Sequence, residues 1–218
     1  MHVIASEPKF LHPFTMLLAG STGSGKTQWL MRLLEHVDMM IDAKLSILYC
    51  YGEVNEYTLA LNSHPRCTTH HGVPTEQQIK DASKASCGKL LLVLDDLLVN
   101  LRAPFLDTLF TKGSHNWNVS VILVTQNAFA RELRVARTNS HYLVLMRNPA
   151  GELQVRTLGA QLFAKRLPYF LESYRDATRE RFSYLLIDMH PKSDDQLRLR
   201  THIFPNEITV AYIAKDNQ

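Results

Sequence analysis

One eight-residue stretch near the start of the chain limits the folds that the chain can adopt. It follows the pattern G-x-x-x-x-G-K-T and reads Gly20-Ser21-Thr22-Gly23-Ser24-Gly25-Lys26-Thr27. Its glycines let the backbone curl tightly, so that several N–H groups point at one phosphate chain. The flanks agree, because residues 14–19 form an apolar run and apolar residues recur at helical spacing from Trp29 to Val37. A strand, a glycine-rich loop and a helix in this order predict a site for a nucleoside triphosphate.

The polar residues of this loop have distinct expected roles. Lys26 is predicted to reach the β- and γ-phosphates, and the hydroxyl of Thr27 is predicted to be a ligand of Mg²⁺. A helix that opens at Gly25 or Lys26 adds the positive end of its dipole. Residues 20–27 are therefore the expected nucleotide site, and Mg²⁺ is the expected metal.

Length and composition predict a single globular domain over residues 1–218. The chain is 45% hydrophobic and 21% charged, which suits one sizeable core. No apolar run reaches the ~18 residues of a membrane span, and residues 1–13 lack the apolar region of a signal peptide. The three cysteines are scattered and odd in number, so no disulfide framework is implied. These features favour an intracellular protein.

Apolar runs and helical patterns alternate along the chain. Strands are expected at residues 14–19, 45–51, 90–94, 119–124, 141–146, 184–188 and 200–204. Helices are expected at residues 26–40, 56–61, 75–85, 105–111, 160–166 and 169–180, and residues 64–74 are expected to be irregular. This order predicts an α/β fold with a mostly parallel sheet, covered by helices on both faces, and with additional C-terminal strands.

Polar side chains follow two of these buried strands. Asp95 and Asp96 come directly after residues 90–94, and Gln126 comes after residues 119–124. Ligands of a parallel α/β sheet bind at the carboxyl ends of its strands. The two acids could be a helix cap or a turn, but Asp95 is the expected partner of Mg²⁺ through water and Asp96 the expected general base. Gln126 could cap its strand, or it could orient the attacking water beside the γ-phosphate.

Six stretches together resemble a known family. They are LLAGSTGSGKT, LLLVLDDL, NVSVILVTQN, NSHYLVLMRNP, YLLIDMHP and LRLRTHIFP, within residues 14–205. They are similar to the viral genome-packaging ATPases of the FtsK–HerA superfamily, notably the type found in poxviruses and polinton-like viruses. The first two mark only a phosphate-loop ATPase, whereas the third and fourth, in this order and spacing, are more specific.

The resemblance implies a RecA-like P-loop NTPase core and ATP as the nucleotide. It implies a homo-oligomeric ring, a pentamer or hexamer, that moves double-stranded DNA into a capsid, with capsid or vertex proteins as partners. It places the protein inside an infected host cell, in the nucleus or cytoplasm, with association with the virion as a further option. It also implies a glutamine in the role given to Gln126. Many relatives outside the viral group carry Asp-Glu where this chain has Asp95-Asp96, so the role of Asp96 rests less on the family than that of Asp95.

The resemblance further implies an arginine that reaches the ATP of a neighbouring subunit. Arg131, Arg134 and Arg137 recur every third residue before the NSHYLVLM strand, as on a solvated helix face or a surface that faces DNA. Arg137 lies closest to the matching stretch and is the first choice, with Arg147 second.

Residues 101–218 hold 16 Lys and Arg against 11 Asp and Glu, a net charge of +5 that is compatible with a polyanion partner.

Two other classes of function stay open from the sequence. A different phosphate-loop enzyme, such as a helicase or a kinase, is the first; a kinase needs an acceptor pocket and a lid, and no arginine-rich lid insertion is visible. A nucleotide-gated scaffold that binds ATP without turnover is the second. The presence of Lys26, Asp95, Asp96 and Gln126 argues against the scaffold.

Overall fold

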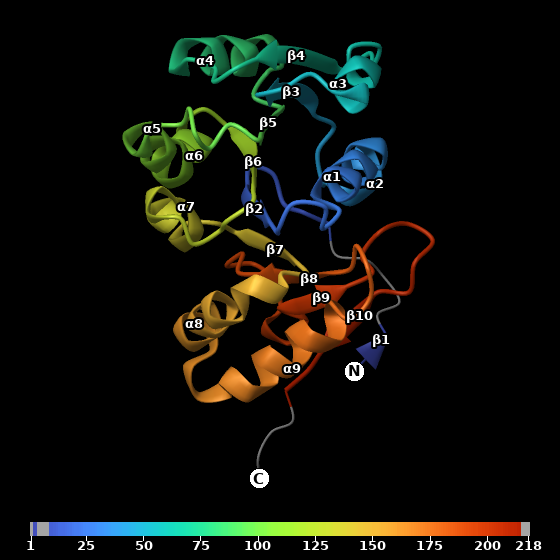
Figure 1. The fold of residues 1–218 in the computed structure, drawn as a ribbon. Helices are drawn as coiled ribbons and strands as arrows, with labels where there is room; N and C mark the ends of the chain where they lie inside the picture. Colours follow the sequence, from blue (N-terminus) through green and yellow to red (C-terminus); the bar gives the residue numbers. More distant parts are fainter. Residues whose placement is uncertain (1, 4–8, 215–218) are drawn as a thin grey trace.

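The described part of the chain forms one ten-stranded sheet with helices packed on both faces (Figure 1). The computed structural model describes residues 2–3 and 9–214, with side chains from residue 9 onward. Part of the stretch from Met1 to Pro13, for which the sequence predicts no targeting signal, lies outside these residues. Within the described ranges, no helix combines the length and the apolar character needed to cross a membrane.

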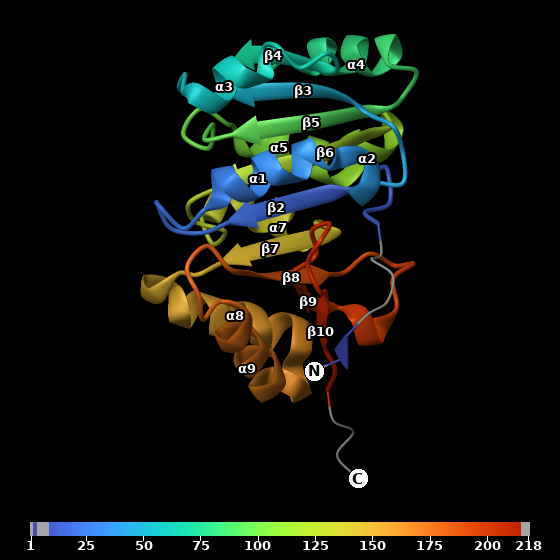
Figure 2. The same ribbon diagram turned by 90° about the vertical axis from the view of Figure 1, so that its right-hand side faces the viewer.

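Six adjacent strands of the sheet run parallel to one another. In sheet order they are β7 (Tyr142–Met146), β2 (Thr15–Ala19), β6 (Val119–Thr125), β5 (Leu90–Asp95), β3 (Ser46–Tyr51) and β4 (Cys67–His71). Figure 2 shows the arrowheads of β2, β3, β5 and β7 pointing to the same side. The sequence predicts all of these strands except β4. Because the strands are parallel, their carboxyl ends form one edge, and the segments that follow them meet there.

Strand β4 corrects the expectation of an irregular segment at residues 64–74. Cys67–His71 pair in parallel with β3, with Cys67 opposite Ile47. β4 lies at the edge of the sheet, and its side chains are half-buried or exposed. An edge strand of this kind needs no apolar run, so no periodic pattern marks it. Its pairing with β3, rather than its own sequence, makes it a strand.

Four antiparallel strands extend the sheet beyond β7, and the three from the C-terminal part of the chain confirm the expected addition. They are β8 (Tyr184–Asp188), β9 (Leu199–Thr201), β10 (Val210–Tyr212) and β1 (His2–Val3). β9 is shorter than expected, and the sequence does not predict β10 or β1, which are too short to show a pattern. A buried ion pair joins β8 to β9, because Arg200 Nη2 donates to Asp188 Oδ2 at 2.8 Å and both side chains are 2–3% exposed.

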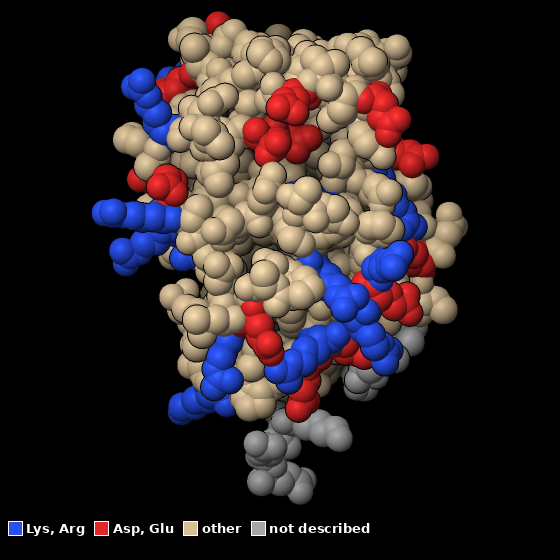
Figure 3. All heavy atoms as spheres, viewed as in Figure 1, with Lys and Arg blue, Asp and Glu red and all other residues tan. Residues whose placement is uncertain are grey.

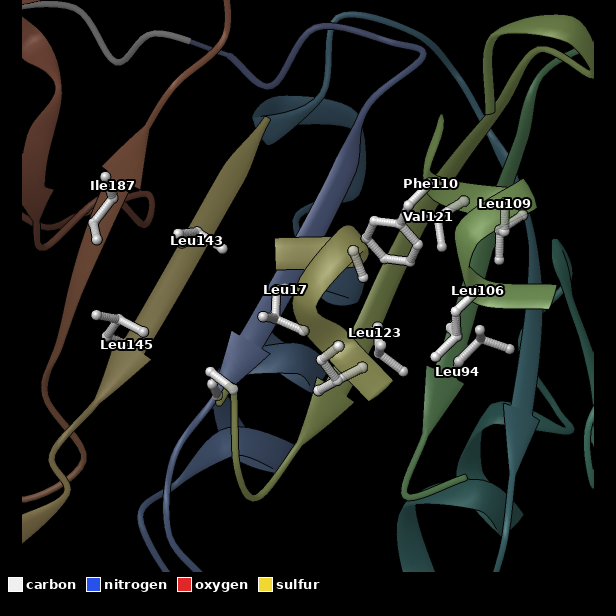
Figure 4. Close-up of a cluster of buried hydrophobic side chains, with 14 of the residues drawn as sticks. Leu17, Leu94, Leu106, Leu109, Phe110, Val121, Leu123, Leu143, Leu145 and Ile187 are labelled. Atoms are coloured by element: carbon white, nitrogen blue, oxygen red, sulfur yellow. The ribbon is translucent and has the colours of Figure 1, made fainter. Parts of the chain in front are cut away.

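The helices divide the core into two layers. On one face lie α1 (Lys26–Glu35), α2 (Val37–Met40) and α3 (Glu56–Leu61). On the other face lie α4 (Glu76–Ala85), α5 (Ala103–Thr108), α6 (Ser114–Asn116), α7 (Arg134–Thr138), α8 (Glu152–Phe163) and α9 (Leu167–Ala177). Alternate residues of each strand serve the two layers: Leu18 packs with Leu30 and Leu33 of α1, whereas Leu17 faces the second layer (Figure 4). The doubly covered sheet is thus confirmed.

Several helix boundaries differ from the pattern in the sequence. The helix expected at residues 26–40 breaks at His36 into α1 and α2. The one expected at residues 105–111 begins two residues earlier and continues as a π-helical turn over Leu109–Gly113. α8 begins at Glu152, eight residues before its expected start. Tertiary packing sets these ends, and the carboxyl edge of the sheet is unaffected by them.

Candidate nucleotide site

The loop of residues 20–27 joins β2 to α1, as its pattern predicts. Gly23 and Gly25 have φ of 74° and 98°, in the left-handed region that favours glycine. A Cβ at Gly20 would come within 2.5 Å of Met146 Cβ on β7. α1 begins at Lys26, and its N-cap residue provides no side-chain hydrogen bond, so the first N–H groups of the helix are left for a ligand. The buried hydroxyl of Ser24 also has no hydrogen-bond partner among the described residues.

The side chain of Lys26 lies across this loop. Its Nζ donates hydrogen bonds to the carbonyl oxygens of Gly20 at 2.8 Å and Ser21 at 3.0 Å. Burial lowers the pKa of Lys26, while the nearby carboxylates of Asp96 and Asp95 oppose that shift. A cation is therefore held next to the loop amides, within electrostatic reach of both acids.

The two acids at the end of β5 occupy different environments. Asp95 is the last residue of the strand and is 8% exposed, and its Oδ2 accepts a hydrogen bond from the hydroxyl of Tyr49 on β3. Burial raises the pKa of Asp95, and the Tyr49 hydrogen bond opposes the rise. Asp96 is exposed and has a φ of 53°. One carboxylate is thus fixed and buried, while the other is open to solvent.

The carboxyl end of β3 shapes the turn that carries these acids. The N–H of Gly52 donates to the carbonyl of Asp95 at 3.3 Å. A Cβ at Gly52 would lie 2.9 Å from the carbonyl oxygen of Asp96. The sequence shows Gly52 only as the end of a strand and Tyr49 only as part of an apolar run. A polar hydroxyl within that run is the one signal that could have pointed to Tyr49.

Gln126 reaches the loop from the next strand. The hydroxyl of Thr22 donates to Gln126 Oε1 at 3.2 Å, and the N–H of Gly20 donates to the carbonyl of Thr125 at 3.3 Å. β6 lies between β2 and β5 in the sheet. The loop, the glutamine and the two acids therefore stand at the ends of three neighbouring strands.

Arg137 and Arg147, the two candidates for reaching the nucleotide of a neighbouring subunit, lie in different environments. Arg137, in the last turn of α7, is half-buried: its Nη1 donates to the carbonyl of Ala128 at 2.7 Å and its guanidinium lies 5.1 Å from the centre of the Phe129 ring. Burial lowers the pKa of Arg137, with a further contribution from Arg134. Arg147 is exposed at the end of β7, and its carbonyl accepts a hydrogen bond from Ser21 Oγ at 3.5 Å. Arg137 is thus tied to the segment after Gln126, and Arg147 borders the loop itself.

The residues at this edge suit a magnesium ion held together with phosphates. Thr27 offers a hydroxyl and Asp95 a carboxylate, and hard oxygen donors of this kind favour Mg²⁺. Mg²⁺ usually keeps several waters and takes only one or two protein ligands besides the phosphates. In the part of the chain that the structure describes, no group of three or more His, Cys, Asp or Glu has the arrangement of a metal site. A dedicated protein cage is not needed for the expected role of these two residues.

A RecA-like core with a glycine-rich loop at the end of β2 defines the fold as that of a P-loop NTPase. No family model matches the chain, and no curated protein matches its sequence. The fold is similar to that of the genome packaging NTPase B204 from Sulfolobus turreted icosahedral virus 2, with a TM-score of 0.57 and 14% identity over 81% of this chain and 92% of that one.

Two further solved structures share this fold. A KaiC-like protein from Pyrococcus horikoshii OT3 has a TM-score of 0.50 and 14% identity, over 92% of this chain and 90% of that one. The type VII secretion ATPase EccC of Thermomonospora curvata has a TM-score of 0.52 and 16% identity, over 92% of this chain and 25% of that one. The expected RecA-like P-loop NTPase fold is thereby confirmed.

Proposed function

We propose that this chain is an ATP-hydrolysing motor that moves double-stranded viral DNA into a capsid. The observation that carries the proposal is the convergence of residues 20–27, Asp95, Asp96 and Gln126 at one edge of a sheet, in a fold shared with a viral genome packaging NTPase. The motor would work as a ring of five or six copies docked on capsid or vertex proteins, inside an infected host cell. The family motifs in the sequence support the same assignment.

Each residue at this edge has a task that its geometry suits. The loop N–H groups and Lys26 would bind the β- and γ-phosphates, and Thr27 and Asp95 would hold Mg²⁺, which neutralises phosphate charge when bound. Asp96, exposed beside Lys26, would accept a proton from the attacking water. Gln126, next to Thr22, would orient that water. Tyr49 holds Oδ2 of Asp95, so the other carboxylate oxygen would be the one available to Mg²⁺ or to a water bound to it.

Replacing each acid by asparagine should distinguish the role of Asp96 in activating water from that of Asp95 in binding the metal. Asp96→Asn keeps the size of the side chain and a residue type that tolerates positive φ, so Mg–ATP affinity should stay within about twofold while turnover falls about 10²-fold. Asp95→Asn retains an acceptor for the buried Tyr49 hydroxyl, yet Mg–ATP affinity should fall about tenfold or more. Calorimetric titration and phosphate release measure the two effects. Normal hydrolysis by Asp96→Asn would instead leave water activation to Gln126 or another group.

A basic surface borders the nucleotide edge. Figure 3 shows the molecule from the same side as Figure 1. Lys and Arg side chains gather over its lower part, where Figure 1 places α8 and α9, and on the side of α7. Arg131, in the short turn before α7, and Arg134, the first residue of α7, are both exposed. Some of the other arginines are balanced by ion pairs, such as Arg175 with Glu152 at 2.8 Å. Arg131 and Arg134 are therefore the first candidates for contact with DNA phosphates.

DNA binding should be tolerant of sequence and steeply dependent on salt. For about six phosphate contacts, affinity should fall on the order of 10³-fold between about 50 and 200 mM salt, because bound phosphates release counterions. The double variant Arg131→Gln, Arg134→Gln should weaken binding to all DNA sequences alike and flatten the salt dependence. Lys44→Gln is the control and should change neither, because Lys44 lies before β3, at the amino ends of the parallel strands. Fluorescence anisotropy with several duplexes measures this. ATPase activity should also rise with DNA, and an affinity indifferent to salt or limited to one sequence would contradict a motor that grips the DNA backbone.

A further inference from the structure

An exposed aromatic side chain lies directly over the glycine-rich loop. Phe182 is 53% exposed, and it belongs to the segment between α9 and β8. A Cβ placed on Gly25 would be 2.8 Å from Phe182 Cδ1 and 3.0 Å from its Cβ, so only glycine permits this approach. The ring therefore rests on the beginning of α1 and leaves the rest of its surface open.

The backbone holds Phe182 in an unusual conformation. Its φ of 61° lies in the left-handed region, which bulky side chains adopt rarely and mostly at functional sites. Two residues later, Tyr184 is buried and packs edge-on against Trp29 of α1, with ring centres 5.8 Å apart. Ser183 Oγ donates to the carbonyl of Glu180 at 2.7 Å. The start of β8 is thus fastened to the same helix that begins at the loop, which holds the ring in place.

The order of the strands indicates which part of a nucleotide lies near this ring. Asp95, Asp96 and Gln126 follow β5 and β6, on one side of β2 in the sheet, so the γ-phosphate end of the chain belongs on that side. β7 and β8 lie on the other side of β2, and Phe182 lies two residues before the start of β8. A triphosphate laid across the loop therefore directs its nucleoside towards Phe182.

We propose that Phe182 is the stacking platform for the base of the bound nucleotide, an inference that rests on the proposed function. Every base has a flat π-face, so an exposed aromatic ring binds it with little regard to sequence or base identity. A pocket of about 330 Å³, lined in part by Arg147, Thr178 and Arg179, lies where the same segment leaves α9. The role is to hold the nucleoside, while the phosphates are held by residues 20–27.

The test compares a nucleotide with a ligand that has no base. Affinities of Mg–ATP and of inorganic tripolyphosphate are measured by calorimetric titration on the full chain. Phe182→Asn removes the ring but suits the left-handed backbone, and it should weaken ATP binding about tenfold, the scale of one base–aromatic stack, while tripolyphosphate binding stays unchanged. Phe182→Tyr keeps the ring and should bind both ligands as the wild type does. Leu59→Asn, which removes a similarly exposed apolar side chain on α3, is the matched control and should change neither affinity.

The remaining outcomes separate this inference from the proposed function. Wild-type affinity for ATP in Phe182→Asn would overturn the platform and leave the nucleotide site intact. Equal losses for ATP and tripolyphosphate would also overturn it, because the ring would then be shaping the loop rather than holding a base. A wild-type chain that binds neither ligand would instead contradict the proposed function itself. If the Lys26 variant weakens binding of both ATP and tripolyphosphate, while Phe182→Asn weakens binding of ATP alone, the proposed function and this inference are both supported.

Discussion

Replacing Lys26 by methionine is expected to lower ATP turnover by at least about 10³-fold. The amine lies over the loop at 2.8 Å and 3.0 Å from two of its carbonyl oxygens, and the β- and γ-phosphates would lose their main cationic side chain. Methionine keeps much of the apolar stem, so the half-buried site stays filled. Phosphate release under saturating ATP measures the loss, and it should be accompanied by weaker binding of both ATP and tripolyphosphate.

A second lysine provides the control for this variant. Lys44 is exposed before β3, at the opposite edge of the sheet from the loop, and Lys44→Met should retain turnover. Thermal melting of both variants shows whether they fold. Wild-type turnover in a folded Lys26→Met chain would remove the phosphate-loop interpretation, since no other described residue of the loop carries a positive charge.

Replacing Arg137 by alanine is expected to lower turnover about 10³-fold while ATP still binds. An arginine delivered by a neighbouring subunit contributes on this scale by stabilising charge in the transition state. In a ring, the mixture of Arg137→Ala with Lys26→Met should therefore exceed either variant alone. Each junction that pairs an intact loop with an intact arginine regains activity. Steady-state turnover across a series of mixing ratios measures the recovery.

The partners of Arg137 within its own chain define the competing result. Its bond to the Ala128 carbonyl and its contact with Phe129 tie it to the segment that follows Gln126. If these contacts are its whole role, mixed rings show no recovery, because each subunit then needs its own arginine. The same mixtures made with Arg147→Ala are the parallel test. Recovery with Arg147→Ala alone would assign the role in trans to that exposed residue.

Much of the candidate site can be read from short stretches of sequence. The spacing of Gly20, Gly25 and Lys26 predicts a loop whose backbone must bend through left-handed conformations, and the structure has φ of 74° and 98° at its second and third glycines. Asp95 follows a fully apolar run and Gln126 follows a mostly apolar one, and a parallel sheet brings their strand ends to one edge. What the pattern does not predict is how these groups are supported. The hydroxyl of Tyr49 comes from 46 residues away, and nothing local in either stretch indicates that it meets Asp95.

The sequence by itself determined the phosphate loop, five of the six parallel strands and the presence of late strands beyond them. These are local signals, set by the conformational freedom of glycine and by apolar runs long enough to show a pattern. Only the tertiary structure decided that Cys67–His71 pairs at the edge, that Arg137 bonds the Ala128 carbonyl, and that Phe182 lies on Gly25. Each of these depends on a contact between elements, which arises from how strands and helices pack and leaves no periodic trace in the chain.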